Sequence, residues 1–491
     1  MILNQDCLIL IIEKLYENKH NSLFSCLLVN RTWCRTVMPI IWRNPWFILS
    51  NINNNNFLKN ATLLINIILL HLSKESKNYL ENQGIDIFTK LNYQQNSLLF
   101  DYLTFTKYIK YRNYKDGCNI YDIVFPSYNN FQRDLIMREV YKLFVSKCSK
   151  IKFMDISGIL QQFYKFPEAE IRISKVQELQ CKSDDDPLLF NGLAQICKFI
   201  QKFIIIYSNS NNELAKLIES QLKVKYIKII YTIDDINDRS IYQAIMKHST
   251  TIDYLSMTIE KNLNLINDLF PKLINLQTLI LHGSLFYRFD FDKQSISSFH
   301  PKLQILQLYS ISFSTIIEII QNTEGNLQTI WLDSNKYENV DQTGQLIRTI
   351  SQHCPNLKYL KIFLKDRYLE DFKQLLINCY LLEGLIIYTD NLYLNYYADK
   401  LLNILNDSSP INLHKFELNY CKFKIETLNS FLNNWRNRKP LWLYSVNVES
   451  NHNMDKFNDM IELYKKEGII KKFKPDKSYN FINDYKEIDL I

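Results

Sequence analysis

Cys354-Pro355-Asn356-Leu357-Lys358-Tyr359-Leu360-Lys361-Ile362 is the stretch that decides the fold. Its apolar residues Leu357, Leu360 and Ile362 are separated by two variable residues and then by one. Because alternate side chains of an extended chain point to opposite faces, Leu360 and Ile362 predict a strand with one buried face. Pro355 stands where a preceding helix must stop.

The same spacing recurs along the chain. Clear copies also begin at Leu276, Leu303, Leu327 and Leu382, and weaker ones at Ile151, Val176, Ile200, Val224, Ile252, Leu413, Leu441 and Ile470. Successive starts lie 24 to 31 residues apart. Random apolar triplets would fall at any spacing, so this regularity predicts an array of repeats from residue 151 to about residue 475.

Amphipathic segments separate the predicted strands. Residues 345–354 place Leu346, Ile347 and Ile350 on one side of a helix, and residues 372–379 are also predicted to be helical. Strand and helix therefore alternate in an α/β fold. A doubly wound α/β domain is the competing fold, but the chain has only 9 glycines and neither G-x-G-x-x-G nor G-x-x-x-x-G-K-[ST], so the solenoid is favoured.

The repeat resembles the leucine-rich repeat, in the longer helix-bearing form often attached to F-boxes. The resemblance implies a right-handed α/β solenoid, a horseshoe with a parallel sheet on its concave side. The family's asparagine, three residues after the last leucine, is Asn335 in one copy and Cys421 in another, whereas Ile311 and Lys365 depart from it. These departures predict irregular turns and leave the fold in place.

The variable strand residues are expected to face the concavity and to bind a protein substrate. The predicted substrate contacts are Tyr226, Tyr254, Ile280, Ile305, Trp331, Tyr359 and Lys361. Trp331 and Tyr359 lie on neighbouring repeats, and large exposed aromatic residues are the usual anchors of protein recognition. The alternative is that Trp331 packs in a local cluster with the adjoining loop.

The first 45 residues predict three short helices, near residues 6–15, 22–29 and 32–42, with Asp6 as an N-cap. Leu8, Ile11 and Leu15 share one stripe of the first helix, and Leu10 extends the apolar surface beyond it. So small a unit buries too little surface to be stable alone. Either a partner docks on it, or it caps the next domain.

Residues 1–45 also resemble the F-box, and residues 25–34 carry most of the resemblance. The matching positions are Leu3, Leu8, Ile11, Leu15, Leu23, Val29 and Trp33, while Asn4 stands where the family has proline. The resemblance implies that these residues bind a Skp-type adaptor, which joins a cullin and a RING protein in an SCF-type ubiquitin ligase. The chain would then be a substrate-recognition subunit, with ubiquitin transfer on other subunits.

Four segments are expected: an F-box-like three-helix docking domain (1–45), a helical bridge or solenoid N-cap (46–150), the leucine-rich-repeat solenoid (151–475) and a C-terminal tail (476–491). Residues 58–72 and 131–148 of the bridge show helical spacing, and no repeat is apparent between residues 46 and 150. A spacer and a solenoid cap are compatible roles for the bridge.

Composition argues against several classes of function. The formal charge of +7, from 58 basic and 51 acidic residues, is too small to predict nucleic-acid binding, and the apolar stretch 61–72 is too short to span a membrane. Ten scattered cysteines without a C-x-x-C pair predict reduced thiols and a cytoplasmic or nuclear location.

Motifs of catalysis are likewise missing. The 8 histidines form no H-E-x-x-H or short Cys/His cluster, no G-x-S-x-G is present, and Asp184-Asp185-Asp186 is expected to be a solvated turn. We expect no metal, no cofactor and no enzymatic activity. A repeat scaffold that binds proteins without any ligase is the alternative function.

Overall fold

The computed structural model describes residues 4–17, 22–50, 57–87, 98–110, 120–159, 162–231, 239–258, 267–283, 300–332, 340–389, 395–419, 421–444, 447–448 and 454–474. The chain divides into two compact units, Met1–His248 and Ser249–Ile491. Each unit is described by itself.

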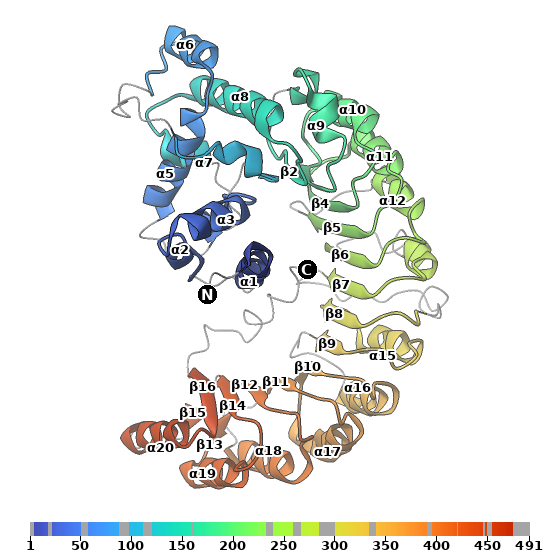
Figure 1. The fold of residues 1–491 in the computed structure, drawn as a ribbon. Helices are drawn as coiled ribbons and strands as arrows, with labels where there is room; N and C mark the ends of the chain where they lie inside the picture. Colours follow the sequence, from blue (N-terminus) through green and yellow to red (C-terminus); the bar gives the residue numbers. More distant parts are fainter. Residues whose placement is uncertain are drawn as a thin grey trace. The chain divides into compact units, whose positions relative to one another are not determined.

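The first unit begins with helices (Figure 1). Helices α1 (Gln5–Glu17), α2 (Ser22–Cys26) and α3 (Arg31–Ile41) lie in the three stretches predicted from the sequence, but α2 ends three residues earlier than expected and residues 27–29 form a turn. Asn30 caps α3 by accepting a hydrogen bond from the Trp33 amide at 2.9 Å. The following elements are α4 (Phe47–Ser50), α5 (Phe57–Leu70), α6 (Lys74–Asn82), the 3-10 helix η2 (Tyr102–Phe105), β1 (Tyr108–Ile109), α7 (Ile120–Val124) and α8 (Asn130–Lys147).

Parallel strands then add one after another to β1. They are β2 (Phe153–Asp155), β3 (Glu178–Lys182), β4 (Lys202–Tyr207) and β5 (Tyr226–Tyr231), each paired with the strand before it. The connections hold η3 (Phe163–Lys165), α9 (Ala169–Ile173), α10 (Pro187–Ile196) and α11 (Asn212–Glu219), and α12 (Arg239–Met246) follows β5.

The second unit repeats the same plan. Its strands are β6 (Tyr254–Thr258), β7 (Thr278–His282), β8 (Ile305–Tyr309), β9 (Thr329–Leu332), β10 (Tyr359–Phe363), β11 (Gly384–Tyr388), β12 (Lys415–Asn419), β14 (Leu441–Tyr444) and β16 (Ile470–Lys474). Its helices are η4 (Phe270–Lys272), α15 (Phe313–Gln321), α16 (Val340–His353), η5 (Asp366–Tyr368), α17 (Leu369–Asn378), α18 (Asn395–Ser408), α19 (Ile425–Asn434) and α20 (Met454–Lys466).

All of these strand pairs are parallel and follow the order of the sequence. Helices lie along one side of the strands (Figure 1). The predicted leucine-rich-repeat α/β solenoid is therefore confirmed. Its core consists of the motif residues, of which Leu279, Leu306 and Leu385 have no exposed surface.

The structure corrects the predicted repeat frame at three places. Segment 46–150, in which no repeat was expected, contains β1, and β1 pairs with β2. Lys415 pairs with Trp442, so the copy assigned to start at Leu441 starts one residue earlier, and the ladder is irregular between Leu441 and Trp442. A separate pair of short strands, β13 (Lys422–Phe423) and β15 (Asn447–Val448), was not expected. Of the positions compared with the family's asparagine, Asn335 lies outside the described residues.

A buried polar position connects successive repeats, three residues before the first apolar motif residue. The side chain there donates to a main-chain oxygen of the preceding repeat. Cys148 Sγ lies 3.4 Å from Leu103 O, Cys197 Sγ 3.4 Å from Ile173 O, Gln221 Nε2 3.0 Å from Cys197 O, His300 Nδ1 3.3 Å from Leu273 O, and Cys379 Sγ 3.4 Å from Cys354 O. Thiol, amide and imidazole are thus interchangeable donors at this position, which accounts for three of the ten cysteines, Cys148, Cys197 and Cys379.

Asparagines directly before the motif make a second set of connections on the surface. Asn275, Asn326 and Asn356 each donate from Nδ2 to a carbonyl about one repeat earlier, at Thr250, Pro301 and Gly325, over 2.7, 2.7 and 3.0 Å. The Gly325 turn has a φ of 74°, a conformation in which a side chain is strained. The repeats that carry these residues are therefore fixed to the preceding ones by side chains as well as by the ladder.

The buried donor position makes a prediction about thiol reactivity. Burial raises the pKa of the Cys197 and Cys379 thiols to about 12, so at pH 8 almost none of either is the reactive thiolate. We expect iodoacetamide to modify the exposed Cys7 in the native protein and to modify Cys197 and Cys379 about a thousandfold more slowly. Peptide mass spectrometry measures the rates of alkylation. Equal rates for Cys7 and Cys379 would contradict the burial of the donor position.

Candidate protein-binding surfaces

The strand register of the second unit aligns the variable residues of its repeats in two rows on one sheet face. The first row contains Tyr254, Thr278, Ile305, Thr329, Tyr359, Gly384, Lys415, Trp442 and Lys472. The second row contains Ser256, Ile280, Gln307, Trp331, Lys361, Ile386, Glu417, Tyr444 and Lys474. We call the surface formed by these two rows the sheet face.

The two rows differ in exposure. In the first row Tyr254, Ile305 and Tyr359 are half-buried. In the second row Ile280, Trp331 and Lys361 are buried, with exposed fractions of 5%, 6% and 5%. The predicted substrate contacts of the first row are therefore partly accessible to a partner protein. Those of the second row are buried beneath the surface of the sheet face.

Trp331 is consequently not the exposed anchor that the sequence suggested. It packs in a cluster with Ile386 and Tyr444, against which Tyr359 and Trp442 also pack. The alternative prediction, a local packing cluster, describes Trp331 better, although the described cluster is made of sheet neighbours and not of the adjoining loop. Strand order explains this, because the row brings together residues that lie more than 50 positions apart in the sequence.

Lysine ammonium groups lie over aromatic rings on the same sheet face. Lys415 Nζ is 5.4 Å from the centre of the Tyr359 ring and 5.2 Å from that of Trp442. Lys472 Nζ is 5.0 Å from Trp442 and 5.5 Å from Tyr444. Within about 6 Å the ring faces attract a cation, so these rings help to position the ammonium groups.

Lys361 and Tyr359 make further contacts on the same sheet face. Lys361 Nζ lies 5.5 Å from the Tyr309 ring and 5.1 Å from the Tyr388 ring. The Tyr359 hydroxyl donates to Glu383 Oε2 at 2.7 Å. Burial, followed by this hydrogen bond, raises the pKa of Tyr359 well above its ordinary value, so the hydroxyl remains a donor at physiological pH.

The first unit contributes one predicted contact, Tyr226. Its ring is half-buried on β5, and Lys202 Nζ of β4 lies 4.5 Å from the ring centre. Lys202 also pairs with Glu178 of β3 at 3.6 Å. Tyr226 therefore belongs to a small group of charged and aromatic side chains on adjacent strands.

The N-terminal helices form the second candidate surface. Leu8 and Leu23 are each only 2% exposed, so they belong to the core of the helices and offer no surface. Leu15 and Trp33 are half-buried, and Leu3 lies outside the described residues. Of the predicted adaptor contacts, Ile11 and Val29 are exposed, with fractions of 44% and 57%.

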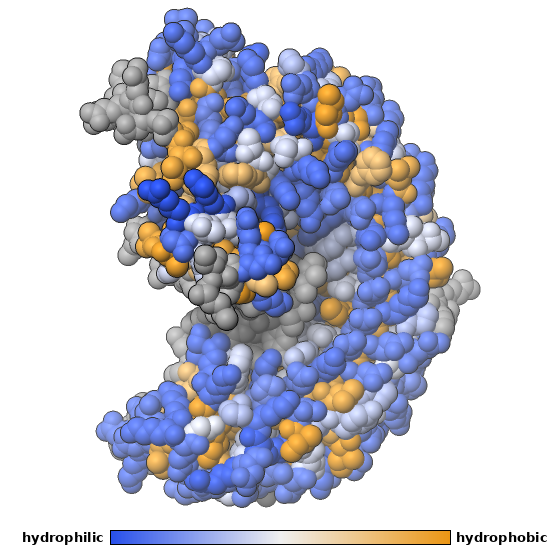
Figure 2. Space-filling view, in the orientation of Figure 1, coloured by the Kyte–Doolittle hydropathy of each residue, from blue (hydrophilic) through white to orange (hydrophobic). Residues whose placement is uncertain are grey.

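Sequence reasoning missed the most exposed apolar residues of this surface. Leu28 is 87% exposed, Leu10 is 68% exposed and Phe24 is 44% exposed. Together with Ile11 and Val29 they form what we call the helical apolar surface. Apolar residues gather over α1 and α2 in the space-filling view (Figure 2). The exposure of Leu10 could have been predicted from the sequence, because this residue lies off the apolar stripe of its helix.

The opposite side of the helices joins the rest of the first unit. The Trp42 and Tyr102 rings lie 4.6 Å apart, and Trp46 Nε1 donates to Tyr108 O at 2.9 Å. The Lys107 amide donates to Arg43 O at 2.9 Å. The helices are therefore connected to η2 and to the first strand.

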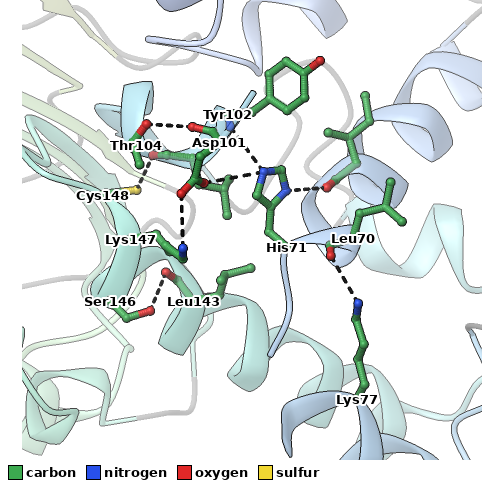
Figure 3. Close-up of polar contacts among 12 residues, drawn as sticks. Leu70, His71, Lys77, Asp101, Tyr102, Thr104, Leu143, Ser146, Lys147 and Cys148 are labelled. Atoms are coloured by element: carbon green, nitrogen blue, oxygen red, sulfur yellow. Dashed lines mark hydrogen bonds and ion pairs between the residues drawn. The ribbon is translucent and has the colours of Figure 1, made fainter. Parts of the chain in front are cut away.

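His71 lies in a polar cluster with Asp101, Tyr102 and Lys147 (Figure 3). His71 Nε2 accepts from the Tyr102 amide at 3.2 Å, which leaves Nδ1 to donate to Ile67 O at 2.9 Å. Asp101 lies 3.7 Å from Nε2 and pairs with Lys147 at 3.2 Å. Both ring nitrogens are used within the fold, so the cluster connects α5, η2 and α8 and provides no free base.

The acidic run is not the solvated turn that was expected. Asp184 is exposed, but Asp185 is only 5% exposed and accepts from the Gly158 amide at 2.6 Å and from the Lys182 amide at 2.7 Å. Asp186 caps α10 through the Leu188 amide at 2.9 Å. Burial raises the pKa of Asp185 to about 7, and the two amide hydrogen bonds oppose that change.

Among the described residues, no three His, Cys, Asp or Glu side chains are arranged to hold a metal ion. No helix in the described part of the chain combines the length and the apolar character that a membrane crossing requires.

No family model matches the chain, and no curated protein matches it. Several solved structures are similar. An internalin (inlF) from Listeria monocytogenes has 13% identity over 69% of this chain and 89% of its own, with a TM-score of 0.35. The Rad7 and Elc1 complex from yeast has 12% identity over 92% and 95%, with a TM-score of 0.42. The leucine-rich-repeat-containing protein LegL7 from Legionella pneumophila has 12% identity over 68% and 96%, with a TM-score of 0.30.

Asp185 generates a prediction about pH. Its carboxyl keeps a proton up to about pH 7 in the folded chain but releases it near the ordinary value of 3.8 when unfolded. The folded state therefore binds more protons between these values, and stability falls as pH rises through this range and levels off above it. We expect Asp185 to remove about 3 kcal/mol from the free energy of unfolding between pH 5 and pH 8.

Denaturant unfolding of Asp185→Asn at both pH values measures this contribution. Between pH 5 and pH 8 the free energy of unfolding of the variant should fall less than that of the wild type. At each pH the variant should be less stable than the wild type, because its amide replaces one acceptor of the carboxyl group by a donor. Asp184→Asn, at the exposed neighbour, is the control and should behave as the wild type. A pH dependence of Asp185→Asn identical to that of the wild type would contradict the assignment.

Proposed function

We propose that this protein is a substrate-recognition subunit of a Skp-cullin-RING ubiquitin ligase. The three N-terminal helices bind a Skp-type adaptor, and the sheet face of the leucine-rich-repeat solenoid binds the target protein. Ubiquitin transfer takes place on other subunits, so the contribution of this chain is to bring the target close to them.

The helical apolar surface is the observation that carries the proposal. Five large apolar side chains, Leu10, Ile11, Phe24, Leu28 and Val29, are between 44% and 87% exposed on one small group of helices. Single exposed apolar residues are ordinary, but a group of them marks an interaction site. The resemblance of residues 1–45 to the F-box suggests that the partner is a Skp-type adaptor.

The proposal assigns the adaptor contact to residues other than those expected from the sequence. Leu8 and Leu23 hold the helices together, so they act on the adaptor only through the shape that they give to the surface. Leu10 and Leu28 take their place as direct contacts in the proposal. Asn4 replaces the family's proline, so the rigid start of the first helix is missing from the expected contact.

Protein binding by the sheet face follows from the architecture. Solenoids present extended rows to which each repeat contributes a variable residue, and here the first row offers half-buried tyrosine, isoleucine and lysine side chains. Aromatic residues that keep part of their surface exposed are efficient contacts because they lose little conformational entropy on binding.

A scaffold without ligase is a second candidate, which one set of contacts favours. Trp42 and Trp46 attach the helices to η2 and the first strand, as a solenoid cap would be attached. Capping alone, however, leaves Leu10 and Leu28 in solvent. Binding to a Skp-type adaptor separates the two functions.

We expect the full chain to bind a Skp-type adaptor and the double variant Leu10→Asp/Leu28→Asp to bind it at least about tenfold more weakly. Fully burying one leucine contributes about 2 kcal/mol, and a carboxylate at the interface adds the cost of its desolvation. Titration calorimetry with purified proteins measures the affinity.

Leu188→Asp/Leu463→Asp is the matched control, since these leucines are 57% and 52% exposed on α10 and α20. It should bind the adaptor as the wild type does. Leu8→Asp is unsuitable, because it places a carboxylate in the core of the helices. Wild-type chain that binds no adaptor, or binding that survives Leu10→Asp/Leu28→Asp, would favour the scaffold.

A further inference from the structure

We infer that the lysine-bearing end of the sheet face, from β10 to β16, binds an acidic segment of the target protein. This inference rests on the proposed function, because it names the chemistry of the target that the sheet face recognises. We call this part of the sheet face the lysine-aromatic surface; its half-buried members are Tyr359, Lys415, Trp442, Lys472 and Lys474, and the buried Lys361, Glu417 and Tyr444 lie beneath them.

Charge is the first step of the argument. The two rows contain four lysines, Lys361, Lys415, Lys472 and Lys474, and one carboxylate, Glu417. Glu417 is only 1% exposed and accepts from Asn419 Nδ2 at 2.9 Å. Lys361 is also buried, with 5% exposed, so the accessible positive charge of the rows comes from the half-buried Lys415, Lys472 and Lys474 on β12 and β16.

Geometry is the second step. Lys415 and Lys472 both belong to the first row, with Trp442 between them. Each ammonium lies 5.0 to 5.5 Å from the centres of two aromatic rings. Ring faces attract the cation, but a carboxylate forms a shorter and stronger charge-assisted hydrogen bond with it. The rings therefore position the ammonium groups for an anionic partner.

Gly384 contributes space to this arrangement. It is the first-row residue between Tyr359 and Lys415, and it has no side chain above the sheet. The Lys415 ammonium can therefore lie across Gly384, 5.4 Å from the Tyr359 ring. A side chain of the target could contact Tyr359 and Lys415 at the same place.

An acidic protein segment fits the surface better than a nucleic acid. Neither row contains an arginine, the side chain best suited to bind phosphate with two hydrogen bonds. A peptide can instead alternate carboxylates, which meet Lys415 and Lys472, with apolar or aromatic side chains, which meet Tyr359 and Trp442.

Fluorescence anisotropy with a labelled random copolymer of glutamate and tyrosine tests the inference on the full-length protein. We expect the copolymer to bind and polylysine not to bind. Lys415→Gln/Lys472→Gln should weaken copolymer binding at least about tenfold, and added salt should weaken binding to the wild type. Lys456→Gln/Lys466→Gln is the matched control, because it removes the same charge from exposed positions on α20; it should bind as the wild type does.

Three results would overturn the inference. The first is copolymer binding that Lys415→Gln/Lys472→Gln leaves unchanged. The second is a single-stranded oligonucleotide that binds more tightly than the copolymer and depends on the same two lysines. The third is copolymer binding that tightens more than tenfold in Asp484→Asn/Glu487→Gln/Asp489→Asn, which would assign the surface to acidic residues of this chain. Adaptor affinity of Lys415→Gln/Lys472→Gln, which should equal that of the wild type, reports on the proposed function separately.

Discussion

Within the described residues, repeats donate hydrogen bonds to main-chain carbonyls of the preceding repeat, and the rest of the structure depends on this constraint. At the start of the strands a single carbonyl, such as Gln328 O, accepts from two consecutive amides of the next repeat, at 2.8 and 3.0 Å. A buried side chain adds a further bond three residues before the motif, as Cys379 does to Cys354. Repeats fixed in this way keep their strands in register, and register places Tyr359, Lys415 and Trp442 in one row.

The fold was largely predictable because its signal is periodic. The spacing of Leu357, Leu360 and Ile362 predicts a half-buried strand. The same spacing recurs every 24 to 31 residues, which predicts a solenoid. The apolar spacing did not predict strands or their exact starts where the repeat is irregular. Strand β1 has only two residues, and the irregular ladder between Leu441 and Trp442 moves the apolar pattern by one position. The donor position could not be recognised from its cysteines, because Gln221 and His300 fill it in other repeats.

The candidate surfaces were less predictable, because exposure depends on neighbours that the local pattern does not reveal. Leu8 and Leu10 are two residues apart on one helix, yet one is 2% and the other 68% exposed. Trp331 occupies the expected row, but Ile386 and Tyr444 from later strands bury it. Asp185 looked like part of a solvated turn until the Gly158 amide, from another repeat, was found to bind it.

The account assigns two activities to separate surfaces: adaptor binding to α1, α2 and α3, and target binding to the sheet face. Hydrogen–deuterium exchange of the full chain with and without a purified Skp-type adaptor tests this division most directly. The account predicts slower exchange within residues 5–41 on adaptor binding and unchanged exchange in β10, β12, β14 and β16. Slower exchange in those strands, with none in residues 5–41, would contradict it.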